Sequence, residues 1–420
     1  MLKIHKLSNN LRIVAEKSDS VKSFTLGIWI KAGSRNENLI NNGISHFIEH
    51  MLFKGTKKRT ALELAEAIEN VGGQINAFTG REATCYYIKA LDEYLPLAFD
   101  ILSDMLFNSS FSLEDIEKEK GVVLEEINMC DDSPEDVLSD LHTYATWQED
   151  SLSLPILGSK KSVSSLTRDA IVEYLDSNYT PERAVISISG NFNEEKLLTL
   201  ANTYFGDWKS NSKSSIVEYS KPTIHHNFLH KDKDIEQLHI SLGLKGYPLG
   251  NELGYTSTLI GNILGGGSSS ILFQKLREEL GLCYSIYTYT TAYNNGGTLN
   301  IYAGLSPQHG AIAAEVIKDE LNKLSEEGIT PELLEITKKK LKGSYILGLE
   351  STSSRMFANG RNILFMDKTY SQQDIIDKID NITMEKVNKV IKECITPGLL
   401  NGAFVGNTSE INQVLTVIKN

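Results

Sequence analysis

The segment His46-Phe47-Ile48-Glu49-His50 contains three side chains that together could activate a water molecule. If this segment is helical, His46 and His50 stand one turn apart and point the same way, with Glu49 on the adjoining edge. Two imidazoles can then share one zinc ion that keeps a position open for water, and a nearby carboxylate can take a proton from that water. The pattern H-x-x-E-H is the inverse of H-E-x-x-H. The alternative is an ordinary helix with polar histidines, and the specificity of the pentapeptide favours the metal site.

A catalytic zinc ion needs a third protein ligand, and the acidic segment 117–129 offers candidates. Glu119 and Glu126 are seven residues apart, so a helix places both on one face, while Glu125 is rotated by about 100°. One of Glu119 and Glu126 could bind the ion, and the other could orient a ligand or the water. Spacing alone does not rank Glu119, Glu125 and Glu126, and a solvated acidic face is the alternative.

The elements around these residues are predicted by their caps and turns. Thr60 and Glu63 form a capping box at the start of a helix, and Ser112 precedes a second, longer helix. Between the two helices, residues 75–91 read as two β-rich runs around the turn 79–82. Helices that alternate with antiparallel hairpins indicate an α+β fold of sandwich type, in which helices pack on one face of antiparallel-rich sheets.

Two short patterns recur at one common offset, the spacing from Gly27 to Gly243, which predicts two structurally related halves. The run around Gly27 (TLGI) returns around Gly243 (SLGL), and a strand ending in Gly-Asn at 190–191 returns at 406–407. Between them, residues 207–234 are polar and lack apolar periodicity. We therefore expect a catalytic domain over 1–206, a linker over 207–234 and a related second domain over 235–420. The linker histidines 225, 226 and 230 lack partners at ligand spacing and do not predict a metal site.

The second half does not repeat the chemistry of the first. At the offset of the repeat, the positions that correspond to His46, Glu49, His50 and Glu126 are Asn262, Gly265, Gly266 and Lys342. None of these reproduces a zinc site, so only the first half is expected to be catalytic. The second half would keep the architecture and serve as a wall or a clamp.

Charge and composition exclude several classes of function. The 420 residues include 42 Lys and Arg against 54 Asp and Glu, so the net charge is -12, which disfavours a nucleic-acid partner. No apolar stretch is long enough to span a membrane, and the first residues do not resemble a secretion signal. The four cysteines are widely spaced and read as free thiols in a reducing compartment. These features predict a cytoplasmic protein.

Taken together, His46-x-x-Glu49-His50, Glu119, Glu126 and the run GGQINAFTGREATCYY resemble the pitrilysin/insulinase family of inverted zincins, particularly its processing-peptidase-like branch of half-length chains. The similarity spans essentially the whole chain. In that family the third ligand follows the second histidine after 75 intervening residues, which corresponds to Glu126. The carboxylate seven residues earlier, here Glu119, supports activity without binding the metal. Ile48 replaces the usual Leu, a near-isosteric change.

The resemblance also gives a role to two further groups of residues. An Arg and a Tyr seven residues apart, matched by Arg277 and Tyr284, grip the substrate backbone in the family. Without the resemblance they would read as a surface Arg and a strand Tyr. Asn76, Ala77, Phe78 and Thr79 resemble the exposed edge strand to which an extended peptide adds. Phe78 would be a pocket wall, and an ordinary core Phe is the alternative. Glu279-Leu280 replaces a more basic pair, which would shift substrate preference.

The expected function is therefore that of a zinc endopeptidase or oligopeptidase with one Zn²⁺ per chain. His46, His50 and Glu126 would bind the ion, and Glu49 would move the proton from water to the leaving amine. Because full-length relatives enclose a chamber with two such halves, a homodimer is implied, in which Arg277 and Tyr284 face the partner's zinc. The alternatives are a catalytically silent scaffold or peptide-binding subunit of the same fold, and a metallohydrolase of non-peptide substrates.

Overall fold

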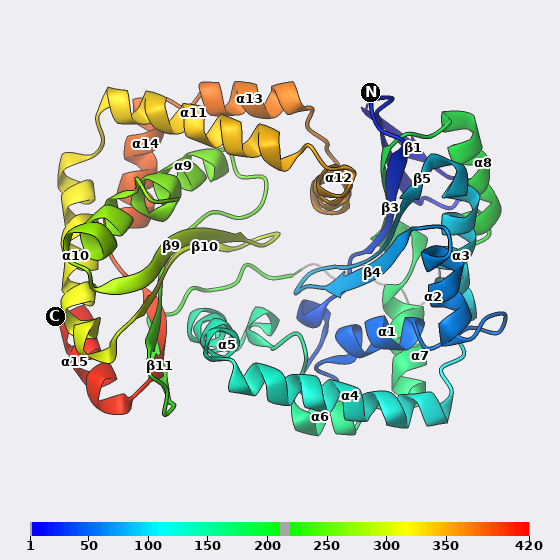
Figure 1. Cartoon of the computed structure of the whole chain (residues 1–420), viewed down its shortest axis with the longest axis horizontal. Helices are drawn as coiled ribbons and strands as arrows, with labels where there is room; N and C mark the ends of the chain where they lie inside the picture. Colours follow the sequence, from blue (N-terminus) through cyan, green and yellow to red (C-terminus); the bar gives the residue numbers. More distant parts are fainter. Residues whose placement is uncertain (1, 211–218, 420) are drawn as a thin grey trace. The chain divides into compact units, whose positions relative to one another are not determined.

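The computed structural model describes residues 2–210 and 219–419, and it divides the chain into two compact units (Figure 1). Unit 1 comprises Met1–Ile127, Leu154–Glu218 and Ile346–Ser371. Unit 2 comprises Asn128–Ser153, Tyr219–Tyr345 and Gln372–Asn420. Each unit therefore includes a segment that lies, along the chain, within the other half.

Unit 1 is built on a six-stranded sheet in the order β1-β2-β6-β3-β5-β4. The strands are β1 (Leu2–Lys6), β2 (Arg12–Lys17), β3 (Ser23–Ile30), β4 (Gln74–Thr79), β5 (Thr84–Leu91) and β6 (Ala184–Gly190). Among these strands, β2 and β6 form the one parallel pair. Strand β4 lies at the end of the sheet, and the predicted hairpin around residues 79–82 is the connection from β4 to β5.

Alternation along the strands gives the sheet two different faces. In β3, Phe24, Leu26, Ile28 and Ile30 are fully buried and belong to the main core of the unit. Helices pack on this face, where α3 and α8 lie beside the sheet (Figure 1). The helices that contribute to this core are α1 (Ile44–Leu52), α2 (Ala61–Glu69), α3 (Leu95–Asn108), α4 (Leu113–Asp132), α6 (Lys160–Ser164), α7 (Arg168–Asn178) and α8 (Glu194–Phe205).

Helix α12 (Thr352–Met366) covers the opposite face of the same sheet, across β2, β3 and β6. It packs closely because β3 has a glycine at the crossing point. A Cβ atom on Gly27 would lie 2.5 Å from the sulfur of Met356. The sequence predicted helices on one face only, and α12 on the second face could not be predicted from local patterns because this helix comes from the far end of the chain.

Unit 2 has a five-stranded sheet in the order β7-β11-β8-β10-β9. Its strands are β7 (Phe228–Asp232), β8 (Leu238–Lys245), β9 (Cys283–Ala292), β10 (Gly297–Leu305) and β11 (Asn401–Gly406). Among these strands, β7 and β11 form the one parallel pair. The helices are α5 (Pro134–Trp147), α9 (Gly254–Gly265), α10 (Gly310–Glu327), α11 (Pro331–Gly348), α13 (Gln372–Asp380), α14 (Met384–Val390) and α15 (Thr408–Lys419).

The two units share one plan, which confirms the predicted α+β fold of two structurally related domains. The repeated glycine patterns lie in equivalent central strands, β3 and β8, and the repeated Gly-Asn patterns follow β6 and β11. The offset between Gly27 and Gly243 also relates α5 to α12 and α3 to α10, within a few positions. As α12 does on unit 1, α5 contacts the central strands of unit 2, at Gly243.

The region predicted as a linker has more structure than its composition suggests. Residues 211–218 of that region lie outside the described residues, but residues 228–232 form strand β7. This strand pairs in parallel with β11 at the edge of the sheet, and its polar composition is tolerated because its side chains are half-buried or exposed. None of the helices in the described part of the chain is both long enough and apolar enough to cross a lipid bilayer.

Candidate metal centre

Helix α1 presents the H-x-x-E-H segment from the core face of the unit 1 sheet. Its apolar residues Ile44, Phe47, Ile48 and Met51 are buried in the main core. This packing fixes the rotation of the helix, because apolar side chains at these spacings form one stripe. His46 and His50 therefore emerge together, and their ring centroids are 4.5 Å apart.

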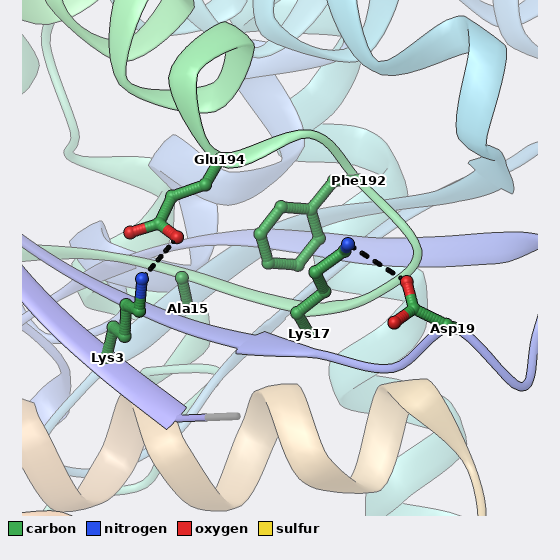
Figure 2. A pocket seen from close by; sticks show the side chains of 6 residues that line it. All are labelled: Lys3, Ala15, Lys17, Asp19, Phe192 and Glu194. Atoms are coloured by element: carbon green, nitrogen blue, oxygen red, sulfur yellow. Dashed lines mark hydrogen bonds and ion pairs between the residues drawn. The ribbon is translucent and has the colours of Figure 1, made fainter.

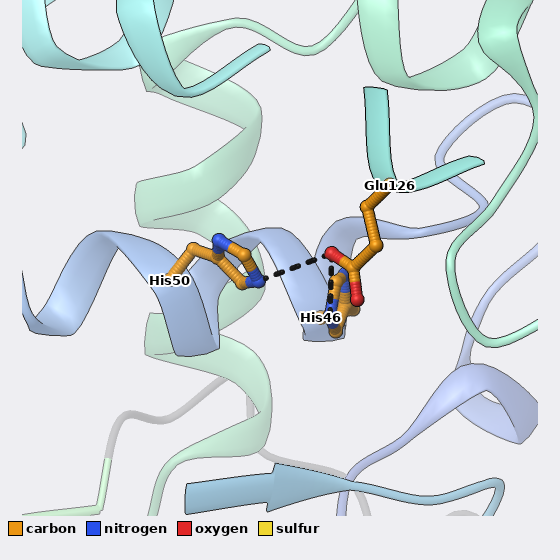
Figure 3. A group of neighbouring side chains, drawn as sticks. All are labelled: His46, His50 and Glu126. Atoms are coloured by element: carbon orange, nitrogen blue, oxygen red, sulfur yellow. Dashed lines mark ion pairs between the residues drawn. The ribbon is translucent and has the colours of Figure 1, made fainter. Parts of the chain in front are cut away.

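Glu126 from α4 completes the group by pointing at both histidines (Figure 3). Its Oε2 lies 3.7 Å from Nε2 of His46 and 3.5 Å from Nε2 of His50. One ligand atom from each of the three residues lies within 4.8 Å of the others. Two imidazole nitrogens and one carboxylate oxygen are a donor set that suits Zn²⁺, so these residues fit the ion. Glu125, the neighbour of Glu126, is exposed and lies outside this group.

Glu119 occupies a different position, behind His50. Its Oε1 lies 2.7 Å from Nδ1 of His50, and its Oε2 lies 2.7 Å from Nζ of Lys54. When Nδ1–H donates to Glu119, the lone pair of His50 is left on Nε2, which is the atom that faces Glu126. In zinc sites, a carboxylate commonly accepts a hydrogen bond from the other ring nitrogen of a zinc-binding histidine and so orients the ring. Glu119 thus lies at Nδ1 of His50, whereas Glu126 lies at Nε2.

Burial and charge act differently on the two histidines. Burial, together with the charge of His50, lowers the pKa of His46 to about 4. Burial also lowers the pKa of His50, but the hydrogen bond and charge of Glu119 outweigh it and raise that pKa. For Glu119, burial is outweighed by the hydrogen bonds from His50 and Lys54, which lower its pKa. His46 is therefore a neutral imidazole, while Glu119 is an anion.

Glu49 lies on the adjoining edge of α1, as its spacing predicts, and its carboxylate contacts the end of β4. The hydroxyl of Thr79 donates to Oε2 of Glu49 at 2.5 Å. Burial raises the pKa of Glu49, and the hydrogen bond from Thr79 partly opposes this shift. A raised pKa suits a carboxylate that must both accept and return a proton. The contact of Thr79 with Glu49 is one that sequence reasoning missed, although Thr79 belongs to the predicted edge strand.

Strand β4 carries Asn76, Ala77 and Phe78 on the end of the sheet, where an added strand could pair. Ala77 packs against the core face, and its N–H donates to Oδ1 of Asn76 at 2.7 Å. Phe78 points to the other face, where its ring lies 5.4 Å from Trp29 and 5.5 Å from Phe357 of α12. Phe78 is 37% exposed, so part of its ring faces solvent beside the edge.

Comparison with protein families places the chain. The model of the insulinase family, peptidase family M16, matches residues 12–160, and the model of the peptidase M16 inactive domain matches residues 165–341. A protein of Bacillus subtilis named uncharacterized zinc protease YmxG is 41% identical over 94% of this chain and 96% of its own length. The chain belongs to peptidase family M16, the insulinase family.

Further comparisons agree with this family. An uncharacterized zinc protease of Mycobacterium bovis is 37% identical over 93% of this chain and 90% of its own length. Among solved structures, a protease from Helicobacter pylori superposes with a TM-score of 0.89 at 22% identity, over 97% of this chain and 99% of the other. A peptidase M16 inactive domain from Pseudomonas fluorescens has a TM-score of 0.89 at 16% identity, over 97% and 98% of the two chains. These structural matches show the fold.

In this M16 chain, the predicted substrate-gripping residues lie together on unit 2. Arg277 lies near the end of a short π-helical segment, Phe273–Glu279, and Tyr284 lies at the start of β9. The guanidinium carbon of Arg277 is 5.3 Å from the ring centroid of Tyr284, whose side chain is 75% exposed. The pair is therefore preformed at the surface of the unit.

Helix α9 follows β8 as α1 follows β3, and it has no room for a side chain at Gly265, the position that corresponds to Glu49. A Cβ atom on Gly265 would lie 2.7 Å from the backbone nitrogen of Thr288 in β9. Within the residues that the structure describes, His46, His50 and Glu126 are the only group of this kind with metal-binding geometry. This agrees with the family model of an inactive domain, which covers α9.

Lys54 is the second contact that sequence reasoning missed. It follows His50 by four residues, and its ammonium binds the carboxylate of Glu119. The spacing of His50 and Lys54 was a usable signal, because residues four apart share a helix face. Lys54 lies just beyond the end of α1, however, and its partner comes from a distant helix.

A second hollow in unit 1 has its charges paired and offers no comparable chemistry (Figure 2). There Lys3 binds Glu194 at 2.6 Å, and Lys17 binds Asp19 at 2.9 Å. Phe192 lies between the two pairs. The group on α1 and α4 is therefore the candidate site of this chain.

Proposed function

We propose that this M16 family member is a zinc-dependent endopeptidase or oligopeptidase that hydrolyses extended peptides with an activated water. The observation that carries the proposal is the convergence of His46, His50 and Glu126, with Glu49 on the adjoining edge of the same helix. The names of its relatives support a zinc protease in general. One Zn²⁺ per chain, held by these three residues, is part of the proposal.

The chemistry divides between the ion and the residues around it. A bound Zn²⁺ acts as a Lewis acid on the peptide carbonyl and lowers the pKa of water. Glu49 accepts the proton of the attacking water and returns it to the leaving amine, while Thr79 holds the carboxylate by its hydrogen bond. Glu119 keeps the ring of His50 in one orientation. Glu49 thus transfers the proton, and Glu119 orients His50.

An extended peptide would bind by adding to the outer edge of β4. Main-chain hydrogen bonds to an edge strand accept many sequences, because they do not depend on side chains. The Ala77 N–H, which is bonded to its neighbour Asn76, would exchange this bond for one to the peptide. Side chains that alternate along the added strand would reach Phe78 on one face and Glu49 on the other.

The test combines metal analysis with cleavage of a mixed peptide library, for the wild type, Glu49→Gln and Glu66→Gln. Glu66 is an exposed glutamate on α2 and serves as the matched control. We expect near-stoichiometric zinc in all three proteins, with cleavage lost only in Glu49→Gln. Zinc binding without cleavage of any peptide or ester by the wild type would contradict a hydrolase and favour a scaffold. Hydrolysis of esters alone would favour a non-peptide substrate.

We further propose that the active form is a homodimer in which Arg277 and Tyr284 of one subunit act at the zinc of the other. The preformed Arg277–Tyr284 pair supports a role in gripping the substrate, but it lies on unit 2. Mixing inactive Glu49→Gln with inactive Arg277→Ala subunits tests the proposal. Recovery of cleavage is expected, and no recovery in a mixture shown to exchange subunits would contradict action between subunits.

A further inference from the structure

Helix α1 begins without a capping side chain of its own. Its N-cap is Gly43, in the left-handed conformation with φ of 92°, and a glycine has no side-chain oxygen with which to cap. The first N–H groups of a helix need acceptors, especially when the helix end is buried. Ser45 in the first turn is fully buried, so another residue must supply the acceptors.

Glu37 supplies them from the preceding loop. Its Oε1 accepts the N–H of Ser45 at 2.8 Å, and its Oε2 accepts the N–H of Gly43 at 2.7 Å. The side chain of Asn42 donates to the same Oε2 at 2.9 Å. Glu37 is only 6% exposed, so this carboxylate is fixed between the loop and the helix. A negative group at this position also complements the helix dipole.

The same loop is attached to the turn between β4 and β5. The N–H groups of Ser34 and Arg35 donate to the carbonyl oxygens of Gly80 and Arg81, at 3.3 and 2.7 Å respectively. The side chain of Arg35 forms a buried ion pair of 2.5 Å with Glu82. The loop 33–37 is therefore bonded at one end to the hairpin that includes β4 and at the other to the start of α1.

A third contact closes this arrangement into a ring. Thr79, the last residue of β4, donates to Glu49 on α1. The hairpin, the loop 33–37 and the helix thus contact one another in pairs. We propose that Glu37 is a positioning residue for the peptidase reaction. Through the loop 33–37, Glu37 holds helix α1 at a fixed position relative to the edge strand β4. This inference rests on the proposed function, because the position of α1 relative to β4 matters only if β4 binds the peptide.

The expected consequence is a loss of geometry at the metal and at Glu49. Catalytic groups must be held within about 0.5 Å of their working positions. If Glu37 loses one acceptor, the start of α1 can shift relative to β4, while the core side of the helix remains packed. The catalytic constant should then fall much more than the KM for a peptide rises, since β4 itself is unchanged.

The test is the substitution Glu37→Gln, with Co²⁺ as a spectroscopic probe of the metal site. A glutamine of the same shape must point its amide NH₂ at one of the two backbone N–H groups. We expect a changed visible Co²⁺ spectrum and a fall of about ten-fold or more in kcat, with a smaller change in KM. Glu16→Gln is the control, because Glu16 is also a partly buried carboxylate, bonded to Arg355 and Asn359 on the opposite face of the sheet.

The outcomes separate the inference from the proposed function. An unchanged Co²⁺ spectrum and kcat in folded Glu37→Gln, with only a lower melting temperature, would mean a merely structural role and overturn the inference. Because the spectrum requires only metal, it remains informative if the wild type cleaves no peptide. If Glu37→Gln does not fold, Arg35→Lys provides the second variant, since it keeps the buried charge beside Glu82. Arg35→Lys is expected to raise KM for peptides. An unchanged KM and kcat would contradict the role of the loop 33–37 in positioning α1 relative to β4.

Discussion

Nδ1 of His50 lies 2.7 Å from Oε1 of Glu119, and this contact gives the two ring nitrogens of His50 different tasks. Nδ1 is used for position, and Nε2 remains available on the side of Glu126. Glu119 is almost fully buried, and its second oxygen binds Lys54. On α4, Glu119 therefore supports His50, and Glu126 is the candidate metal ligand.

Removal of Glu119 should weaken metal binding without abolishing it. In Glu119→Ala, His50 loses the acceptor that fixes its ring, and we expect about 10- to 100-fold lower zinc affinity in competition with a chelator. Glu126→Ala should lose stoichiometric zinc. Glu125→Ala, on the exposed neighbour of Glu126, is the control and should bind zinc like the wild type. Equal affinity of Glu119→Ala and wild type would refute the positioning role of Glu119.

Lys54 should act on the metal through Glu119. In Lys54→Met, the buried carboxylate of Glu119 loses one of its two hydrogen-bond partners, so it orients His50 less firmly. We expect a smaller loss of zinc affinity than in Glu119→Ala, and little further loss in the double variant. The control is Lys118→Met, because Lys118 pairs with Glu114 on the exposed side of α4. Independent, additive losses in the double variant would show that Lys54 acts by another route.

Gly27 and Gly243 leave space for the helices α12 and α5, which come from distant parts of the chain. A methyl group at either glycine should therefore lower the stability of the fold. In Gly243→Ala, the new Cβ would overlap Asn401 and lie 2.9 Å from Nε2 of His142. We expect a loss of about 1–3 kcal/mol in unfolding free energy. Gly343→Ala, in α11 with no atom within 4 Å of the added Cβ, should instead stabilise by about 0.5–1 kcal/mol. Urea denaturation measures both, and equal effects would contradict the close packing at Gly243.

Buried His142 should make unit 2 less stable in acid. Its Nδ1 contacts the hydroxyl of Ser241 at 2.6 Å and its Nε2 contacts Oδ1 of Asn401 at 2.9 Å. Burial lowers the pKa of His142 to about 4, although the bond to Asn401 opposes this. The unfolded chain, with a histidine pKa of about 6.5, therefore binds a proton first as the pH falls.

The stability of unit 2 should accordingly decrease between about pH 6.5 and pH 4, by an amount on the order of 3 kcal/mol. Hydrogen exchange of peptides from β8 and β11 at several pH values measures it. In His142→Gln, the pH dependence should be flatter but not absent, because burial also lowers the pKa of His239 in the same unit. An identical pH dependence in His142→Gln and wild type would rule out His142 as the source.

Much of the site could be predicted from the sequence because its chemistry is local. His46, Glu49 and His50 belong to one helical turn, where spacing alone determines which side chains point together. The repeat that relates Gly27 to Gly243 likewise predicted two related halves, because the same short strand pattern with a glycine can be recognised twice in the sequence. The capping box of Thr60 and Glu63 marked the start of α2 for the same local reason.

Only the tertiary structure decided the contacts that join distant segments. Glu119, Glu125 and Glu126 stayed unranked by spacing, and the rotation of α4 against α1 separated them into a support, an exposed residue and a ligand candidate. The roles of the loop 33–37 and the helix α12 were also invisible, since their partners lie far away along the chain. Residue types and periodicity determine what each segment can do, whereas packing between segments determines which side chains meet.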